Sequence, residues 1–191
     1  MVEEDIRLVK LALKGQRLAF KRLVEKYQNF VFTITFKVLR SREEAEEAAQ
    51  DVFIKVYKTL SSFEQKSKFS TWLYTIAYRT AIDKSRKKQL NTYSIDNDDS
   101  FIQIEDTGRD NPDKQLFRGD LHDQLHQAIQ HLKSTDATLI TLFYLHEKSV
   151  KEIAEITGLS ISNIKTKLHR VREALKKVLS KQLKAELQDL L

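Results

Sequence analysis

Residues 150–170 of the chain read VKEIAEITGLSISNIKTKLHR. Ser149 to Glu152 has the form of a capping box, which starts a helix. Ala154 is small where two helices would cross closely, and Gly158 can take the positive φ of a tight turn. These residues predict a helix-turn-helix, with Ile153, Leu159, Ile164 and Leu168 closing its small core. The alternative is a plain helical hairpin, which does not require this combination.

Cations follow the predicted turn at helical spacing. They are Lys165, Lys167, Arg170, Arg172, Lys176 and Lys177. A helix that carries such a row can enter the major groove of DNA, where its cations neutralise phosphates and its early side chains reach bases. The second half of the chain therefore predicts a DNA-reading helix.

The composition of the whole chain agrees with a helical, DNA-binding protein. Four glycines and one proline in 191 residues disfavour sandwiches and barrels, and the absence of cysteine excludes disulfide scaffolds and cysteine-based metal sites. The net charge of +6 suggests a polyanionic partner. The first residues are acidic and no apolar run is long enough to span a bilayer, so we expect a cytoplasmic protein without direct membrane insertion.

The first half of the chain predicts four helices. Apolar residues at helical spacing occupy 6–13, 20–38, 45–60 and 69–82. The β-branched run 31–35 could also form a strand, but the three-to-four spacing continues through it and favours helix. A capping box at Ser41 to Glu44 starts the third helix, and a polar loop at 61–68 precedes the fourth.

The two halves are separated by an acidic segment without periodicity. We assign 1–89 to a first domain, 90–113 to a flexible linker and 114–191 to a second domain. Asn111-Pro112 ends the linker, and two further helices follow, the second with Ser134 as a possible N-cap. The predicted fold class is all-α, with two small helical domains.

Three motifs, in order, resemble those of the extracytoplasmic-function (ECF) sigma factors, which are promoter-recognition subunits of bacterial RNA polymerase. They are AAQDVFIKVY at 48–57, KFSTWLYTIA at 68–77 with Ala81-Ile82-Asp83 and Arg86, and KTKLHRVREA at 165–174. The likeness covers nearly the whole chain. It implies a four-helix, region 2-like domain that binds core polymerase and the minus-ten element, a linker threaded through polymerase, and a region 4-like domain that reads the minus-thirty-five element.

The resemblance also implies where this chain would meet core polymerase. Glu47, Gln50 and Asp51 match the family's contact motif on the third helix. In the family this helix docks on a basic coiled coil, although Glu47 and Asp51 each differ from the common pattern in carboxylate length. An ordinary solvated helix face explains the same charges. The acidic composition of the linker likewise has two explanations, mimicry of nucleic acid and plain solvation.

For the minus-ten element, the family captures a flipped base in a pocket under the loop at 61–68. By this resemblance Phe63 would stack on a base, Lys66 would pair with a phosphate and Ser67 would donate a hydrogen bond. Arg79 and Arg86 would complete this surface. Trp72 could be a melting wedge, but it shares the face of Phe69, Leu73 and Ile76, which favours a place in the core.

For the minus-thirty-five element, the matching positions on the recognition helix are Lys165, Thr166, His169 and Arg170, with Lys151 as a phosphate contact. His169 departs from the aromatic or basic residue common at its position, so its base preference is open.

Other functional classes fit less well. His122 and His126 are four residues apart and could share a metal, but no carboxylate accompanies them at a recognisable spacing. We therefore expect no metal site. We also expect no cofactor and no enzymatic activity. A helix-turn-helix regulator that binds duplex DNA without polymerase explains only the second half, and an anti-sigma decoy would need no recognition helix. The resemblance adds a membrane-associated anti-sigma factor to the expected partners.

Overall fold

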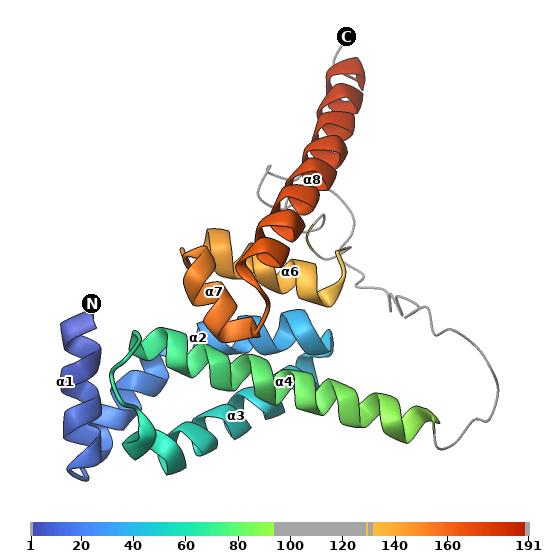
Figure 1. Ribbon diagram of the computed structural model, residues 1–191. Helices are drawn as coiled ribbons and strands as arrows, with labels where there is room; N and C mark the ends of the chain where they lie inside the picture. The colour runs from blue at the N-terminus through green and yellow to red at the C-terminus, as the bar shows by residue number, and fades with distance from the viewer. Residues whose placement is uncertain (1, 94–128, 130–131, 190–191) are drawn as a thin grey trace.

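A computed structural model describes residues 2–93, 129 and 132–189, and every regular element in these ranges is helical. The predicted all-α class is therefore confirmed. In chain order the elements are α1 (Val2–Leu13), α2 (Arg17–Leu39), α3 (Arg42–Thr59), the 3₁₀ turn η1 (Leu60–Ser62), α4 (Phe69–Tyr93), α6 (Ser134–Ile140), the π-helical turn η2 (Thr141–Leu145), α7 (Val150–Thr157) and α8 (Ile161–Asp189) (Figure 1).

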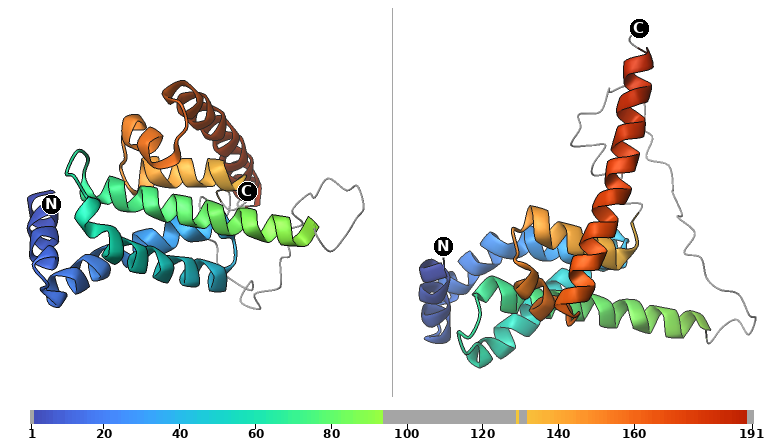
Figure 2. Two further views of the ribbon diagram at one scale, coloured as in Figure 1. Left: turned by 60° about the horizontal axis from the view of Figure 1, so that its bottom comes forward. Right: turned by 45° about the horizontal axis from the view of Figure 1, so that its top comes forward.

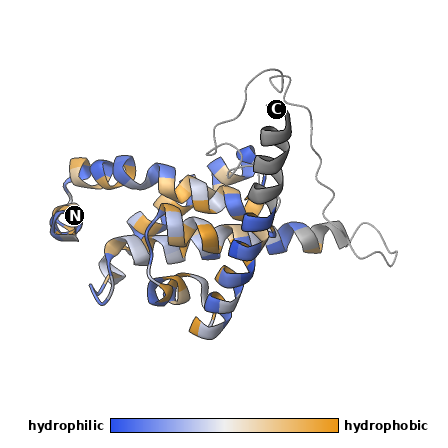
Figure 3. Ribbon diagram, turned by 90° about the horizontal axis from the view of Figure 1, so that it is seen from above, coloured by the Kyte–Doolittle hydropathy of each residue, from blue (hydrophilic) through white to orange (hydrophobic). Residues whose placement is uncertain are grey.

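Helices α2, α3 and α4 pack on one another and form the core of the N-terminal domain. The β-branched run in α2 is helical, as predicted, because it supplies the buried stripe that includes Val31, Ile34 and Thr35. The hydroxyl of Thr35 donates to the carbonyl oxygen of Ala45 on α3, so this buried polar group is satisfied. Hydrophobic and hydrophilic residues alternate around the helices, as amphipathic packing requires (Figure 3).

Helix α1 is tied to α2 by a buried carboxylate. Asp5 accepts a hydrogen bond of 2.6 Å from the hydroxyl of Tyr27 and lies 2.6 Å from the Nζ of Lys26. Burial and the bond to Asp5 raise the pKa of Tyr27 well above its usual value. A buried charge is stable only when it is paired in this way.

The two predicted capping boxes differ in the structure. At α7 the box is complete: Glu152 N donates to Ser149 Oγ, and Ser149 N donates to the Glu152 carboxylate. At α3 only the serine half forms, because Glu44 N donates to Ser41 Oγ while the Glu44 carboxylate pairs with Lys88 of α4. The turn residue Gly158 has φ +74°, as its place in the motif predicts.

One predicted helix cap needs correction. Ser134 is the first residue of α6 and does not cap it, since Lys133 occupies the N-cap position without a side-chain bond. Helix α4 continues to Tyr93, and the assignment of 1–89 to a first domain stays a prediction. The rest of the predicted acidic linker, Asn111-Pro112 and the pair His122 and His126 lie outside the described residues.

The C-terminal domain has its own small core and also packs against the first domain. Leu139 and Leu142 meet Ile153, Ile164 and Leu168 in a hydrophobic cluster that continues into the N-terminal domain. Helix α7 packs against α4, and α6 packs against α2, while the distal part of α8 extends away from the other helices (Figures 1 and 2). Over the part of the chain that the structure describes, no helix is long and apolar enough to cross a membrane.

Candidate nucleic-acid and polymerase interfaces

The start of α8 presents the predicted recognition residues together on one exposed face. Lys165, Thr166, His169 and Arg170 are all exposed. Ile164 and the residues one and two turns further on, Leu168 and Val171, are buried on the opposite side and fix the rotation of the helix. The hydroxyl of Ser160 accepts from Asn163 N at 3.2 Å and caps this end. The apolar face of α8 is packed on the domain, and its polar face can enter a groove of DNA.

Two cations of the predicted row are already engaged within the domain. Lys167 Nζ lies 3.0 Å from a carboxylate oxygen of Asp136. The guanidinium of Arg172 lies over the rings of Phe143 and Tyr144, and its Nε donates to the Tyr144 hydroxyl at 2.7 Å. These contacts hold the two side chains against the domain in this structure. Lys151, at the start of α7, is exposed.

The loop before α4 places its aromatic residue differently from expectation. Phe63 is only 8% exposed, and its ring packs 5.5 Å from that of Phe69 and 5.4 Å from that of Trp72. The expected stacking of Phe63 on a base stays a prediction, and in this structure the ring is largely buried beside these two aromatic residues. Trp72 is half-buried in the same group and packs on the core, as its spacing predicts.

The polar residues of this surface remain accessible. Lys66 is exposed and pairs with Glu64 across a turn in which Gln65 has φ +59°, and Ser67 is half-buried. Arg79 and Arg86 are exposed on α4 and are seven residues apart, which places them on the same side of the helix two turns apart. The described structure thus keeps the polar candidates for minus-ten contact on the surface.

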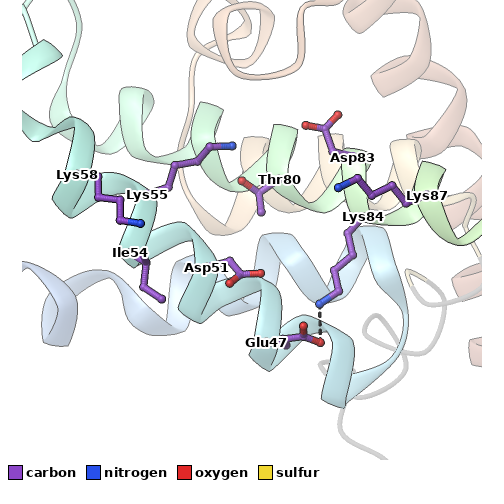
Figure 4. Close-up of a pocket in the computed structure, with 9 residues that line it drawn as sticks. All are labelled: Glu47, Asp51, Ile54, Lys55, Lys58, Thr80, Asp83, Lys84 and Lys87. Carbon is purple, nitrogen blue, oxygen red and sulfur yellow. Dashed lines mark ion pairs between the residues drawn. The ribbon is translucent and has the colours of Figure 1, made fainter.

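The predicted polymerase face of α3 is exposed at Glu47, Gln50 and Asp51. Glu47 and Asp51 line a groove of about 480 Å³ between α3 and α4 (Figure 4). The other lining residues are Ile54, Lys55, Lys58, Thr80, Asp83, Lys84 and Lys87. Glu47 lies 2.6 Å from Lys84 Nζ, so a basic partner would compete with Lys84 for this carboxylate. The acidic pattern of α3 gave no sign of this neighbour, which lies on α4.

A further cluster joins the two domains and was not foreseen from sequence. Glu152 of α7 lies 3.0 Å from Lys68 Nζ, and Lys148 Nζ donates to Ser70 Oγ at 2.6 Å. Burial acts to raise the pKa of Glu152, but the backbone and hydroxyl donors of Ser149, with Lys68 and Lys148, lower it to about 2. Burial lowers the pKa of Lys148.

The ring of His146 lies in this junction, between an aromatic ring of α2 and one of α4. Its ring is 4.8 Å from that of Phe30 on α2 and 5.5 Å from that of Tyr74 on α4. Burial and the nearby charge of Lys148 lower the pKa of His146 to about 4. The histidine is therefore neutral at ordinary pH.

Comparison with known families matches both domains separately. Sigma-70 region 2 matches residues 23–90, and Sigma-70 region 4 matches residues 122–175. Together these ranges define the chain as a sigma factor.

Similar whole chains narrow the assignment. The ECF RNA polymerase sigma factor SigW of Bacillus subtilis is 34% identical, over 94% of this chain and 97% of its own length. The RNA polymerase sigma-H factor of Pseudomonas aeruginosa is 30% identical, over 93% of this chain and 94% of its own. The chain belongs to the ECF sigma factor family.

Solved structures support the fold. CnrH, in complex with the cytosolic domain of CnrY, aligns with a TM-score of 0.62 and 18% identity, covering 93% of this chain and 98% of its own. The sigma factor RpoE of Bartonella quintana, in complex with the anti-sigma factor NepR, aligns with a TM-score of 0.63 and 23% identity, covering 84% and 96%. At these identities the likeness is one of fold.

Proposed function

We propose that this chain binds core RNA polymerase and directs it to specific promoters, with the N-terminal domain recognising and helping to melt the minus-ten element and α8 reading the minus-thirty-five element. The observation that carries this proposal is the exposed face of α8, where Lys165, Thr166, His169 and Arg170 stand opposite a fully buried apolar stripe. Membership of the ECF family supports the dependence on polymerase.

The side chains of the recognition helix differ in the DNA groups that they can contact. Arg170 can bond two acceptors on one guanine edge, and Lys165 can bond a base edge or a phosphate. The Thr166 hydroxyl donates to Ser162 O at 3.0 Å, which leaves its oxygen as an acceptor and its methyl group for an apolar contact. Lys151 neutralises a phosphate from the first helix of the motif.

On the minus-ten side, Lys66, Arg79 and Arg86 supply positive charge along the melted strand, and Ser67 supplies a hydrogen bond. Phe63 has a structural role that the other candidates do not have. By packing on Phe69 and Trp72 it anchors the loop at 61–68 to α4. Glu47, Gln50 and Asp51 dock on core polymerase, where complementary charge speeds and orients association more than it adds affinity.

The chain acts without chemistry of its own, since polymerase carries out phosphoryl transfer, and we place it in the cytoplasm with polymerase. The expected anti-sigma partner is supported by one solved neighbour, the sigma factor RpoE in complex with the anti-sigma factor NepR. An anti-sigma factor would compete with polymerase or promoter DNA for the exposed faces described above.

Run-off transcription with purified core polymerase and a library of promoter fragments tests the function. We expect sequence-selective initiation only when polymerase and this chain are both present. An Arg170→Ala variant should lose selectivity at the minus-thirty-five element, while Lys133→Ala, an exposed change in the same domain, should not. Unchanged polymerase output, with particular duplexes bound by the chain alone, would instead indicate a helix-turn-helix regulator.

A further inference from the structure

The side chain of Arg172 is held on the surface of α8 by two aromatic rings of another element. Arg172 is exposed. Its guanidinium carbon lies 5.2 Å from the centre of the Phe143 ring and 5.6 Å from that of the Tyr144 ring. Its Nε donates a hydrogen bond of 2.7 Å to the Tyr144 hydroxyl. We call Phe143 and Tyr144 the aromatic seat of Arg172.

The seat is built by the π-helical turn η2. His146 N donates to Thr141 O at 3.1 Å, which is the wide spacing of such a turn. Turns of this kind are rare and are frequent at functional sites. The two rings of the seat pack edge to face, with centroids 5.0 Å apart. Tyr144 is nevertheless 54% exposed, so its ring contributes more to the contact with Arg172 than to the core.

The seat leaves most of the donors of Arg172 available. A guanidinium carries five N–H donors, and here Nε–H is bonded to Tyr144. Among the residues that the structure describes, no other hydrogen bond or ion pair holds this guanidinium. Its two terminal NH₂ groups keep the planar fork that binds phosphate through two parallel bonds. Because the side chain is already ordered, it loses less conformational entropy when it binds a partner.

The position of Arg172 on α8 favours a phosphate over a base. Arg172 follows Lys165 by seven residues and precedes Lys176 by four, so these three exposed cations lie along one side of the helix. Thr166 and His169 lie beside this row, on the recognition face. When a helix enters the major groove, the side chains at its centre reach base edges, and those at its flank meet the phosphates of the groove wall.

We propose that Arg172 contacts a backbone phosphate of the minus-thirty-five element, and that Phe143 and Tyr144 hold its guanidinium in place for this contact. Tyr144 is a positioning residue, because it acts through Arg172. The inference rests on the proposed function, since it takes α8 to enter the major groove. It adds to the DNA-reading surface two residues of η2, an element that precedes the helix-turn-helix.

Holoenzyme binding to a labelled promoter duplex, measured by fluorescence anisotropy at several salt concentrations, tests the phosphate contact. Arg172→Ala should lower the affinity by about tenfold on every sequence and reduce the slope of log affinity against log salt concentration by about one. A loss of preference at one base pair, or a slope equal to that of the wild type, would overturn the assignment to a phosphate.

A double-mutant cycle tests the positioning role of Tyr144. Tyr144→Phe keeps the ring and removes the hydroxyl that bonds Nε, so it should lower the affinity by about threefold on all sequences with little change in slope. In the Arg172→Ala background the same substitution should have no effect, because no guanidinium remains to be positioned. Equal losses in both backgrounds would overturn the positioning role. Tyr57→Phe is the matched control and should bind like the wild type, since Tyr57 is exposed on α3 and its hydroxyl has no hydrogen bond among the described residues.

Promoter-selective run-off by the wild type separates this inference from the function on which it rests. Selective initiation, together with equal effects of Tyr144→Phe in the two backgrounds, would remove the positioning role and leave the sigma function intact. Absence of selective initiation would be a failure of the function itself and would remove both.

Discussion

The two segments that we assign to promoter DNA lie in different surroundings. At the start of α8 the four candidate residues face solvent and are fixed by a buried stripe behind them. At the start of α4, Lys68, Ser70 and Thr71 are held by Glu152 and Lys148 of the other domain. A surface that reads intact duplex can be preformed on a rigid helix, whereas a surface for melted DNA is of use only after polymerase has bound. In this structure the start of α4 is in contact with Lys148 and Glu152, whereas the recognition face of α8 has no such neighbour among the contacts described above.

The largest expected effect is on the stripe that fixes the recognition face. Ile164→Ala removes a fully buried side chain and should lower the free energy of unfolding by about 2–5 kcal/mol, since it leaves a cavity between α8 and α7. Thermal or urea unfolding measures the change. Ile161→Ala, one turn earlier and 42% exposed, is the matched control. Equal effects of the two variants would show that the stripe does not hold α8.

The next effect distinguishes base contacts from phosphate contacts in the helix-turn-helix. Arg170→Ala should cost about 1–3 kcal/mol on the preferred minus-thirty-five sequence and relax the preference at one base pair. Lys151→Ala should weaken all sequences alike and lower the salt dependence of binding. Titration of holoenzyme on matched and mismatched duplexes distinguishes them. A uniform loss in both variants would place Arg170 on the backbone instead.

The stability of the junction between the domains should respond to pH. His146 stays neutral in the folded protein down to about pH 4, whereas an exposed histidine gains its proton near pH 6.5. Between these values the opened or unfolded chain binds more protons, so stability should fall as the pH is lowered from about 6.5 to 4. After allowance for the solvent that reaches the ring, we expect about 1–2 kcal/mol.

Urea unfolding of the wild type across this window gives the measurement, with His146→Phe as the comparison. Glu152 keeps its charge throughout, because its pKa of about 2 lies below the window. Loss of the pH response in His146→Phe is the expected outcome. The same slope in both proteins would assign the response to other groups.

The smallest effect compares the two helix caps. Ser149→Ala removes a complete capping box on α7 and should cost about 1–2 kcal/mol. Ser41→Ala removes a half-formed box on α3 and should cost about 0.5–1 kcal/mol, because Glu44 is held by Lys88 instead. Chemical unfolding of both variants gives the difference, and a larger loss at Ser41 would contradict the assigned cap geometry.

Local patterns in the sequence predicted most of the helices and the turn. The spacing of apolar residues, the Ser149 box and Gly158 act over a few residues, so they can be interpreted without the rest of the chain. The residues of the recognition face came from the family resemblance, and the burial of Ile164 and Leu168 agrees with their outward position.

Contacts between distant segments could not be predicted in this way. The burial of Phe63 depends on two aromatic residues of α4, and the pairing of Glu47 depends on Lys84 of the same helix. The docking of α7 on α4 joins residues about eighty positions apart through single hydrogen bonds and ion pairs. Such pairs leave no periodic signal in either segment.

Permanganate reactivity of unpaired thymines tests the central claim most directly. On a promoter fragment chosen by the run-off selection, we predict reactive thymines in the minus-ten element only when core polymerase and this chain are present together, and none with either alone. Melting by polymerase without the chain, or protection of the duplex by the chain without any melting when both are present, would contradict the account.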